Sequence, residues 1–188
     1  MKRFSLFVLI VLSLAGVQKS YAQARSSIGL NLMVNKPFAD SYRFGTGFAV
    51  QGTIALGSNW AIAPEVGYDK VNRSKAVYNS PVDGPISLYG NVSSLDLFTF
   101  DLAARYYILP SLYAKLGPML YAAGGNEDLA GLGIGGTAGL GYQLLLDKRN
   151  KLEFSLNTDL INVTRSVGNG ATPIAGLKIG YVFNFKAE

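Results

Sequence analysis

Apolar and polar residues alternate along most of the chain. In residues 98–108 the even positions are apolar, whereas the odd positions include Thr99, Asp101 and Arg105. A period of two is typical of a β-strand with one apolar face. The same alternation predicts about eight strands, which we place at 28–34, 48–56, 60–68, 98–108, 114–120, 132–144, 152–160 and 175–185. Each is near the 9–11 residues that a tilted membrane strand requires.

The segments between these strands alternate between short and long. Short turns are predicted at 57–59, 109–111 and 147–150, and longer connections at 36–43, 70–93, 123–130 and 162–172. An outer-membrane barrel has short periplasmic turns and longer extracellular loops. The pattern therefore predicts a closed antiparallel barrel with both termini in the periplasm.

The second face of the strands separates two kinds of eight-stranded barrel. A soluble barrel directs its apolar face inward around a ligand, whereas a membrane barrel directs it outward against lipid. The second face here is polar and interspersed with glycine; its polar members are Gln51, Thr53, Glu65, Asp101, Arg105, Lys115, Gln143, Glu153, Asn157, Asp159, Lys178 and Asn184. It has too many glycines, and too few Lys and Glu residues, for a soluble exterior. We predict an all-β fold, a closed antiparallel transmembrane β-barrel.

The N-terminus has the features of a secretory signal peptide. Lys2 and Arg3 precede an apolar stretch, 4–17, and small residues permit cleavage after Ala22 or Ala24. The stretch is shorter than a spanning helix needs, although a retained anchor is the alternative. We predict a signal peptide at 1–22 (alternative end 24) and a barrel domain at 23–188. Loss of residues 1–22 lowers the net charge from +5 to +2, because three of the 17 basic residues leave with them. Since the remaining basic residues are scattered, we expect no nucleic-acid binding.

Composition excludes most catalytic chemistry. The chain contains no histidine and no cysteine. A Ser-His-Asp triad, an imidazole or thiolate metal site and a thiol nucleophile are therefore absent. Two kinds of outer-membrane enzyme, the lipid A deacylases and the omptin-like proteases, use a histidine in their active sites. The absence of histidine therefore argues against these enzymes as well. We expect neither an enzyme nor a cofactor or metal site.

Charged residues on the predicted inner face form a candidate lumen network. Its members are Glu65, Asp101, Arg105, Lys115, Glu153, Asp159 and Lys178. Charge on the lipid face near the midplane costs about 2–4 kcal/mol for Arg or Lys, so these groups are expected to face inward. Two interpretations remain: an inert salt-bridged plug, or a gated or ion-conducting constriction. In the plug, Arg105 is expected to pair with one or more of the four carboxylates.

Aromatic residues and prolines give two further predictions. Aromatic residues near strand ends suggest two interfacial girdles. The periplasmic girdle would contain Trp60, Tyr107, Tyr113, Tyr142, Phe154, Phe183 and Phe185, and the other Tyr42, Phe44, Tyr68, Phe98 and Tyr121. Pro64 and Pro118 lie inside strand patterns and cannot donate a ladder hydrogen bond, so a β-bulge is expected at each.

The same prolines lie in segments with a family resemblance. The segments 63–68 (APEVGY) and 115–120 (KLGPML) resemble the PE-x-GY and K-x-GP-x-L segments of the outer-membrane β-barrel domain family. That family comprises small porin-like and OmpA-like barrels of Gram-negative bacteria, many of them in Bacteroidota. The resemblance runs from Ile28 to Phe185. The segment 179–185 (IGYVFNF) is similar to the family's last strand, which implies recognition by the barrel-assembly machinery.

Two functions remain open. The first is a non-enzymatic outer-membrane protein with a structural or surface-interaction role, carried by the longest connection. Its candidate contacts are Lys70, Arg73, Lys75, Tyr78 and Tyr89. The second is a narrow passive channel for ions or small solutes. For either we expect an outer-membrane monomer in contact with lipid and lipopolysaccharide.

Overall fold

The chain forms an all-β structure. The computed structural model describes residues 25–38, 42–73, 77–80, 84–87, 94–124, 131–161 and 172–185. They contain ten strands: β1 (Ser27–Pro37), β2 (Tyr42–Ala55), β3 (Trp60–Arg73), β4 (Val77–Ser80), β5 (Gly84–Ser87), β6 (Leu95–Tyr107), β7 (Leu112–Gly124), β8 (Gly131–Leu145), β9 (Asn150–Ile161) and β10 (Thr172–Asn184). Over these ranges, no helix has the length and apolarity needed to span a membrane.

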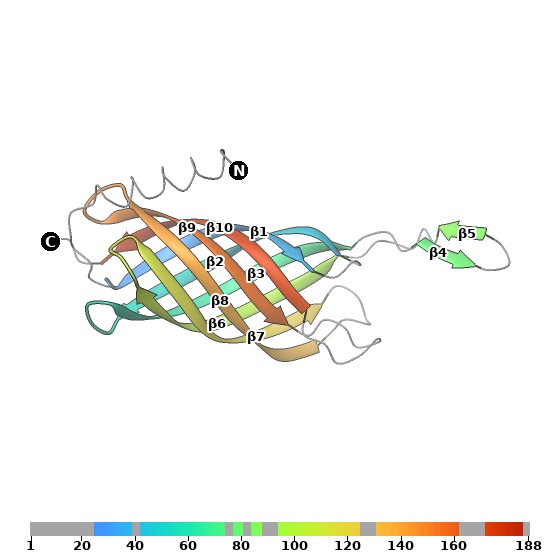
Figure 1. Ribbon diagram of the computed structural model, residues 1–188, viewed down its shortest axis with the longest axis horizontal. Coiled ribbons are helices and arrows are strands. Elements are labelled where there is room, and N and C mark those ends of the chain that lie inside the picture. The colour runs from blue at the N-terminus through green and yellow to red at the C-terminus, as the bar shows by residue number, and fades with distance from the viewer. Residues whose placement is uncertain are drawn as a thin grey trace, which may run out of the picture.

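Eight of the described strands close into one barrel (Figure 1). Their order is β1-β10-β9-β8-β7-β6-β3-β2, and every neighbouring pair is antiparallel. The closing seam pairs β1 with β10, from Ser27 opposite Asn184 to Pro37 opposite Ile174. Strands β4 and β5 pair only with each other, within the connection between β3 and β6. The predicted closed antiparallel barrel of about eight strands is therefore confirmed.

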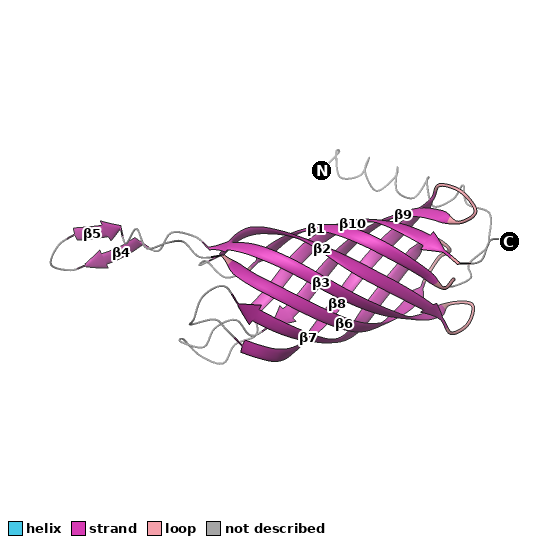
Figure 2. Cartoon of the chain, turned by 180° about the vertical axis from the view of Figure 1, so that it is seen from behind, coloured by secondary structure: helices cyan, strands magenta, loops and turns pink. Residues whose placement is uncertain are grey.

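The connections differ at the two ends of the barrel. Four-residue turns at 56–59, 108–111 and 146–149 lie together at one end, on the right of Figure 2. We call this the turn end. The opposite loop end carries the connections 38–41, 74–94, 125–130 and 162–171. The first of these is shorter than the predicted 36–43, because β1 continues to Pro37 and β2 begins at Tyr42.

The two faces of the wall have opposite character. Burial alternates residue by residue, as in β1 and β6. Leucines and other apolar side chains point outward; Leu32 is 66% exposed and Leu116 69% exposed. Polar side chains point inward, and Arg105 is fully buried (0% exposed). An apolar exterior around a polar interior is the arrangement of a transmembrane barrel.

The two strand prolines do not cause bulges. The register between β2 and β3 is the same on both sides of Pro64, and that between β6 and β7 is the same on both sides of Pro118. Pairing is only interrupted beside each proline, while Pro64 stays paired with Leu102 and Pro118 with Gly136 on the other side. The bulge prediction is wrong, because the wall tolerates two local gaps in its ladder without a change in residue count.

Candidate functional site

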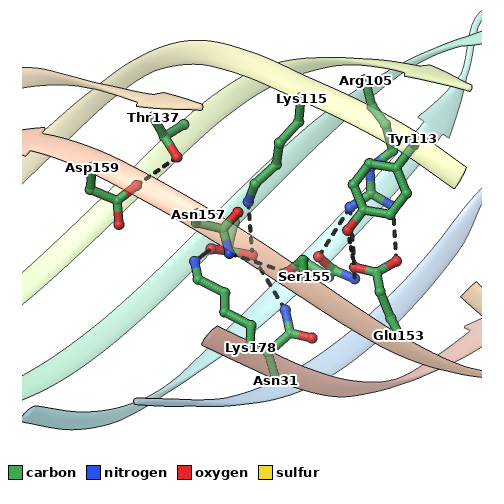
Figure 3. A network of polar contacts seen from close by, with 12 residues as sticks. Asn31, Arg105, Tyr113, Lys115, Thr137, Glu153, Ser155, Asn157, Asp159 and Lys178 are labelled. Atoms are coloured by element: carbon green, nitrogen blue, oxygen red, sulfur yellow. Dashed lines mark hydrogen bonds and ion pairs between the residues drawn. The ribbon is translucent and has the colours of Figure 1, made fainter. Parts of the chain in front are cut away.

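All seven residues of the predicted charge network lie on the inner wall of the barrel. Six of them are buried, and Asp159 is partly buried. They come from β3, β6, β7, β9 and β10. Figure 3 shows five of them along the lumen: Arg105, Lys115, Glu153, Asp159 and Lys178. The lumen is therefore the candidate site, and its contacts fall into groups from the turn end to the loop end.

The group nearest the turn end surrounds the carboxylate of Glu153. Arg105 donates from Nη1 to Glu153 Oε2 at 3.1 Å, and its Nη2 donates to Glu153 Oε1 and to Gln51 Oε1 at 3.4 and 3.3 Å. Gln51 and Gln143 donate to the two carboxylate oxygens at 2.8 and 2.6 Å, and the Tyr113 hydroxyl donates to Oε1 at 2.8 Å. The buried carboxylate is thus neutralised by one guanidinium and held by three further donors. Arg105 pairs with one of its four expected partners.

Tyr113 is buried in the lumen beside this pair (Figure 3). Its ring lies 3.9 Å from the Arg105 guanidinium carbon, within cation–π distance. Gly141 stands opposite Tyr113 on β8, and a Cβ there would overlap the tyrosine ring. Glycine at 141 therefore makes room for a large side chain in a narrow interior.

The middle group surrounds Glu65. Lys178 forms a buried ion pair with Glu65 Oε1, and the Lys115 ammonium lies 3.8 Å from Oε2. Asn31 donates to Oε2 at 3.3 Å. One carboxylate therefore contacts two buried ammonium groups, those of Lys115 and Lys178, which Figure 3 labels. Asp101 is 1% exposed, and no described residue donates a hydrogen bond to its Oδ1.

Toward the loop end, polar contacts give way to an apolar cluster. Asn35 donates to Asp69 at 2.5 Å, and Thr137 donates to Asp159 at 2.6 Å. Beyond them lie buried apolar side chains from six strands: Tyr42, Val71, Leu95, Leu97, Met119, Tyr121, Ile161 and Ile174. The lumen is thus ionic near the turn end and apolar near the loop end.

Comparison with known proteins identifies the architecture. No family model and no curated protein sequence matches the chain. Among solved structures, Neisserial surface protein A has a TM-score of 0.56 at 16% identity, covering 85% of this chain and 97% of its own. OprG of Pseudomonas aeruginosa has a TM-score of 0.55 at 14% identity, over 89% and 100%. Ail of Yersinia pestis, solved with the heparin analogue sucrose octasulfate, has a TM-score of 0.52 at 14% identity, over 87% and 99%.

The chain has the fold of the eight-stranded outer-membrane β-barrels. The similarity extends over nearly the full length of each neighbour, so it covers the whole barrel and not a single hairpin. The neighbours include barrels of Gram-negative bacteria. The sequence resemblance to the outer-membrane β-barrel domain family therefore agrees with the structure at the level of fold.

The inner wall of the barrel also holds residues that were assigned to its girdles. Tyr107 and Tyr113 are 4% and 0% exposed, and their rings pack together in the lumen with Ala61. Tyr42 and Tyr121 are buried in the apolar cluster. The prediction that these four form girdles is wrong, because their strand parity directs them inward. Other predicted girdle residues lie on the outer wall: Phe44, Trp60, Tyr68, Phe98, Tyr142, Phe154, Phe183 and Phe185.

The predicted loop contacts lie at the loop end or beyond the described residues. Lys70 is exposed on β3, opposite Thr46 and Asp96. Arg73 ends β3 and Tyr78 lies in β4, but their side chains are outside the described part of the structure. Lys75, Tyr89 and the predicted signal peptide are also outside it.

Several lumen residues were missed by the sequence analysis, and Asp69, Asn31 and Asn35 show why. Asp69 has the same parity as Glu65, but the strand had been ended at residue 68. Asn31 and Asn35 alternate with apolar residues in β1 and bind Glu65 and Asp69. Extension of the parity rule by one residue in β3, and to all polar residues in β1, would have found them.

One turn is ordered by a charged side chain outside the membrane-spanning strands. Asp147 accepts hydrogen bonds from the side chain of Asn150 at 2.6 Å and from the backbone N–H groups of Arg149 and Asn150 at 2.7 and 2.8 Å. These hydrogen bonds lower the pKa of Asp147 below its usual value, and the bond from the Asn150 side chain has the largest effect.

Within the described residues, no group of three or more acidic side chains is arranged to hold a metal ion.

Proposed function

We propose that the protein is a non-enzymatic outer-membrane barrel of a Gram-negative bacterium whose lumen is closed. Its termini face the periplasm, and its loop end faces the cell exterior. Its role is structural or lies in recognition at the cell surface, where the longest connection is displayed. The outer-membrane fold and the placement of the three short turns at one end support this orientation.

The burial of charged and apolar side chains in the lumen is the observation that carries the proposal. An eight-stranded barrel has an interior just wide enough for side chains. Here Arg105, Tyr113 and Glu153 are fully or almost fully buried near the turn end. The apolar cluster occupies the loop end. A solute would have to separate an ion pair at one level and cross an apolar layer at another.

Recognition is therefore assigned to the connections. Binding residues are often displayed on loops above a rigid scaffold. The connection 74–94 is the longest at the loop end, and it includes the paired strands β4 and β5. The candidate contacts remain Lys70 and Arg73 at the end of β3, together with Lys75, Tyr78 and Tyr89. Ail, which shares this fold, was solved with a heparin analogue, so the architecture is compatible with binding of an anionic polymer.

The remaining proposed partners belong to the membrane. Outer-membrane lipid and lipopolysaccharide surround the apolar wall, and the barrel-assembly machinery reads the last strand during biogenesis. The barrel is proposed to act as a monomer. Recovery of the mature chain in the outer membrane, with a gel mobility that changes on boiling, tests the location, because a closed hydrogen-bonded barrel resists detergent until heated.

Planar-bilayer conductance tests the closed lumen against the narrow passive channel. The parent protein is expected to give no stable unitary steps. Steps that change in Lys115→Gln or Asp101→Asn, but not in the turn variant Lys148→Gln, would establish the channel instead. All three variants must first show the parent's heat-modifiable mobility.

Replacement of residues 75–89 by a short Gly-Ser turn tests the loops. Folding is expected to persist, because the barrel's ladder hydrogen bonds lie outside this segment. Adhesion of expressing cells to immobilised heparin, and any uptake or adhesion phenotype, would be compared with the parent. A solute-uptake phenotype that survives this replacement and disappears with Asp101→Asn would contradict the proposal.

A further inference from the structure

The outer wall carries a groove that runs from β1 across β10, β9 and β8 to β7, with Phe44 of β2 beside its β1 end. The groove encloses about 970 Å³ and is open to the outside. Its floor is made by small residues on three successive strands, Ala138, Thr158 and Ala175. A row of leucines, one position nearer the turn end on the outward face, forms one bank: Leu140, Leu156 and Leu177. The outer wall is therefore hollowed along the row of small residues, beside the row of leucines.

The groove slants from the loop end toward the middle of the barrel. Its row begins at Lys36, the next-to-last residue of β1, and continues to Ala175, the fourth residue of β10. It ends at Leu116, which is the fifth residue of β7 counted from the turn end. Four strand spacings of about 4.8 Å give a length of about 19 Å. The hydrocarbon layer of one leaflet is about 15 Å thick, so the groove is long enough to follow an acyl chain of that leaflet.

A positive charge stands at the loop end of the groove. The Lys36 ammonium donates to the Tyr42 carbonyl at 2.7 Å and lies 5.8 Å from the centroid of the Phe44 ring. An ammonium group has three donors, so this carbonyl leaves others for an anion. Arg43, next to Phe44, is exposed. No acidic residue lines the groove among the described residues.

We propose that this groove binds one acyl chain of a phosphorylated lipid of the outer leaflet, with Lys36 contacting the lipid phosphate. The chain lies over Ala175, Thr158 and Ala138, and the headgroup lies at the loop end. The inference rests on the proposed orientation, in which the loop end faces the exterior. Charge complementarity selects this occupant over a second copy of the protein, because a symmetric pairing through this face would bring two Lys36 ammonium groups together.

A second groove provides an internal comparison. It encloses about 550 Å³ over β3, β6, β7 and β8, and Ala122 contributes to its lining. Its lining is apolar or uncharged and includes no basic residue. It is smaller than the first groove and offers nothing to a phosphate. Filling this groove is therefore the matched control for filling the first.

The test uses the full mature chain, folded in non-ionic micelles and titrated with lipid A, with native mass spectrometry as the measurement. The parent is expected to retain one lipid A, and less of its dephosphorylated form. Lys36→Gln is expected to weaken lipid A binding about fivefold, the equivalent of about 1 kcal/mol for one basic residue, and to leave the dephosphorylated lipid unaffected. Ala175→Leu fills the groove and weakens both lipids. Ala122→Leu and Lys148→Gln are expected to bind as the parent does.

Several outcomes would overturn this assignment. Parental lipid binding by Ala175→Leu would show that the groove holds no acyl chain, and equal binding of both lipids by the parent would remove the phosphate contact. A dimer that Ala175→Leu dissociates, with lipid binding unchanged, would assign the groove to a second copy. Residues 75–89 do not line the groove, so the variant in which they are replaced is expected to bind lipid A as the parent does. Loss of surface recognition in that variant would therefore leave this lipid site unaffected, and loss of lipid binding in Ala175→Leu would leave surface recognition unaffected.

Discussion

Replacement of Arg105 by alanine is expected to destabilise the barrel strongly. The side chain is fully buried, and its guanidinium makes three hydrogen bonds to Glu153 and Gln51. Removal of one partner of a buried ion pair costs about 3–5 kcal/mol, because the other charge is left uncompensated. Glu153 keeps three donors, from Gln51, Gln143 and Tyr113, which favours the lower part of that range.

Urea unfolding in detergent micelles measures this loss. With a slope of about 2 kcal/mol per molar urea, a change of about 3 kcal/mol moves the midpoint by about 1.5 M. Trp60, the single tryptophan of the chain, is 53% exposed on the outer wall, so its fluorescence reports loss of the lipid-like environment. Lys148→Ala, in an exposed turn, is the matched control and is expected to unfold as the parent does.

Two further variants separate charge from volume. Arg105→Met retains much of the side-chain volume and is expected to stay well below the parent midpoint. Combined with Glu153→Gln, it is expected to lose less than the sum of the two single changes, since neither charge then remains alone. A parental midpoint for Arg105→Ala would refute the closed-lumen argument. A parental midpoint for Arg105→Met would refute its electrostatic part.

Three other outcomes are expected. Asp147 should titrate below its usual pKa in NMR spectra; because the folded pKa is depressed, its contribution to turn order is present above the unfolded pKa and is lost as pH falls through the folded value. Gly180→Ala should lower the urea midpoint, since its Cβ would lie 2.9 Å from Asn31 Cγ, whereas Gly124→Ala, with no atom within 4 Å, should not. Glu65→Gln should lower the midpoint more than Gly124→Ala does, because it leaves two buried ammonium groups without their shared carboxylate.

Strand parity was the part of the structure most accessible from sequence. A period of two places residues on alternate faces whatever their partners are, so it located Arg105 and Glu65 on the inner wall. Tyr107 and Tyr113 show what happens when residue type is weighed above parity. Aromatic identity suggested a membrane interface, but both belong to the inward positions of their strands. Parity was already decisive at these two sites.

Partner choice was not accessible in the same way. Arg105 lies on β6 and Glu153 on β9, and these strands are not neighbours in the barrel. Their pairing depends on which side chains reach the same level across the lumen. That level depends on the registers of the three strand pairings between them, β6–β7, β7–β8 and β8–β9. The residue pattern within a single strand does not determine these registers. The prolines illustrate another limit: a missing N–H is visible in sequence, but whether the chain bulges or leaves a gap depends on the strands beside it.

The seam between β1 and β10 makes barrel formation a nearly all-or-none event. It joins the first described strand to the last, so before it forms, two strand edges carry unpaired N–H and C=O groups. Hydrocarbon offers these groups no partner. An open, half-inserted sheet therefore has no stable position in the bilayer, and its closure must accompany entry into the membrane. The length of the loop-end connections can thus vary freely. The first and last barrel strands, in contrast, must be paired along their length for the protein to be stable in the membrane.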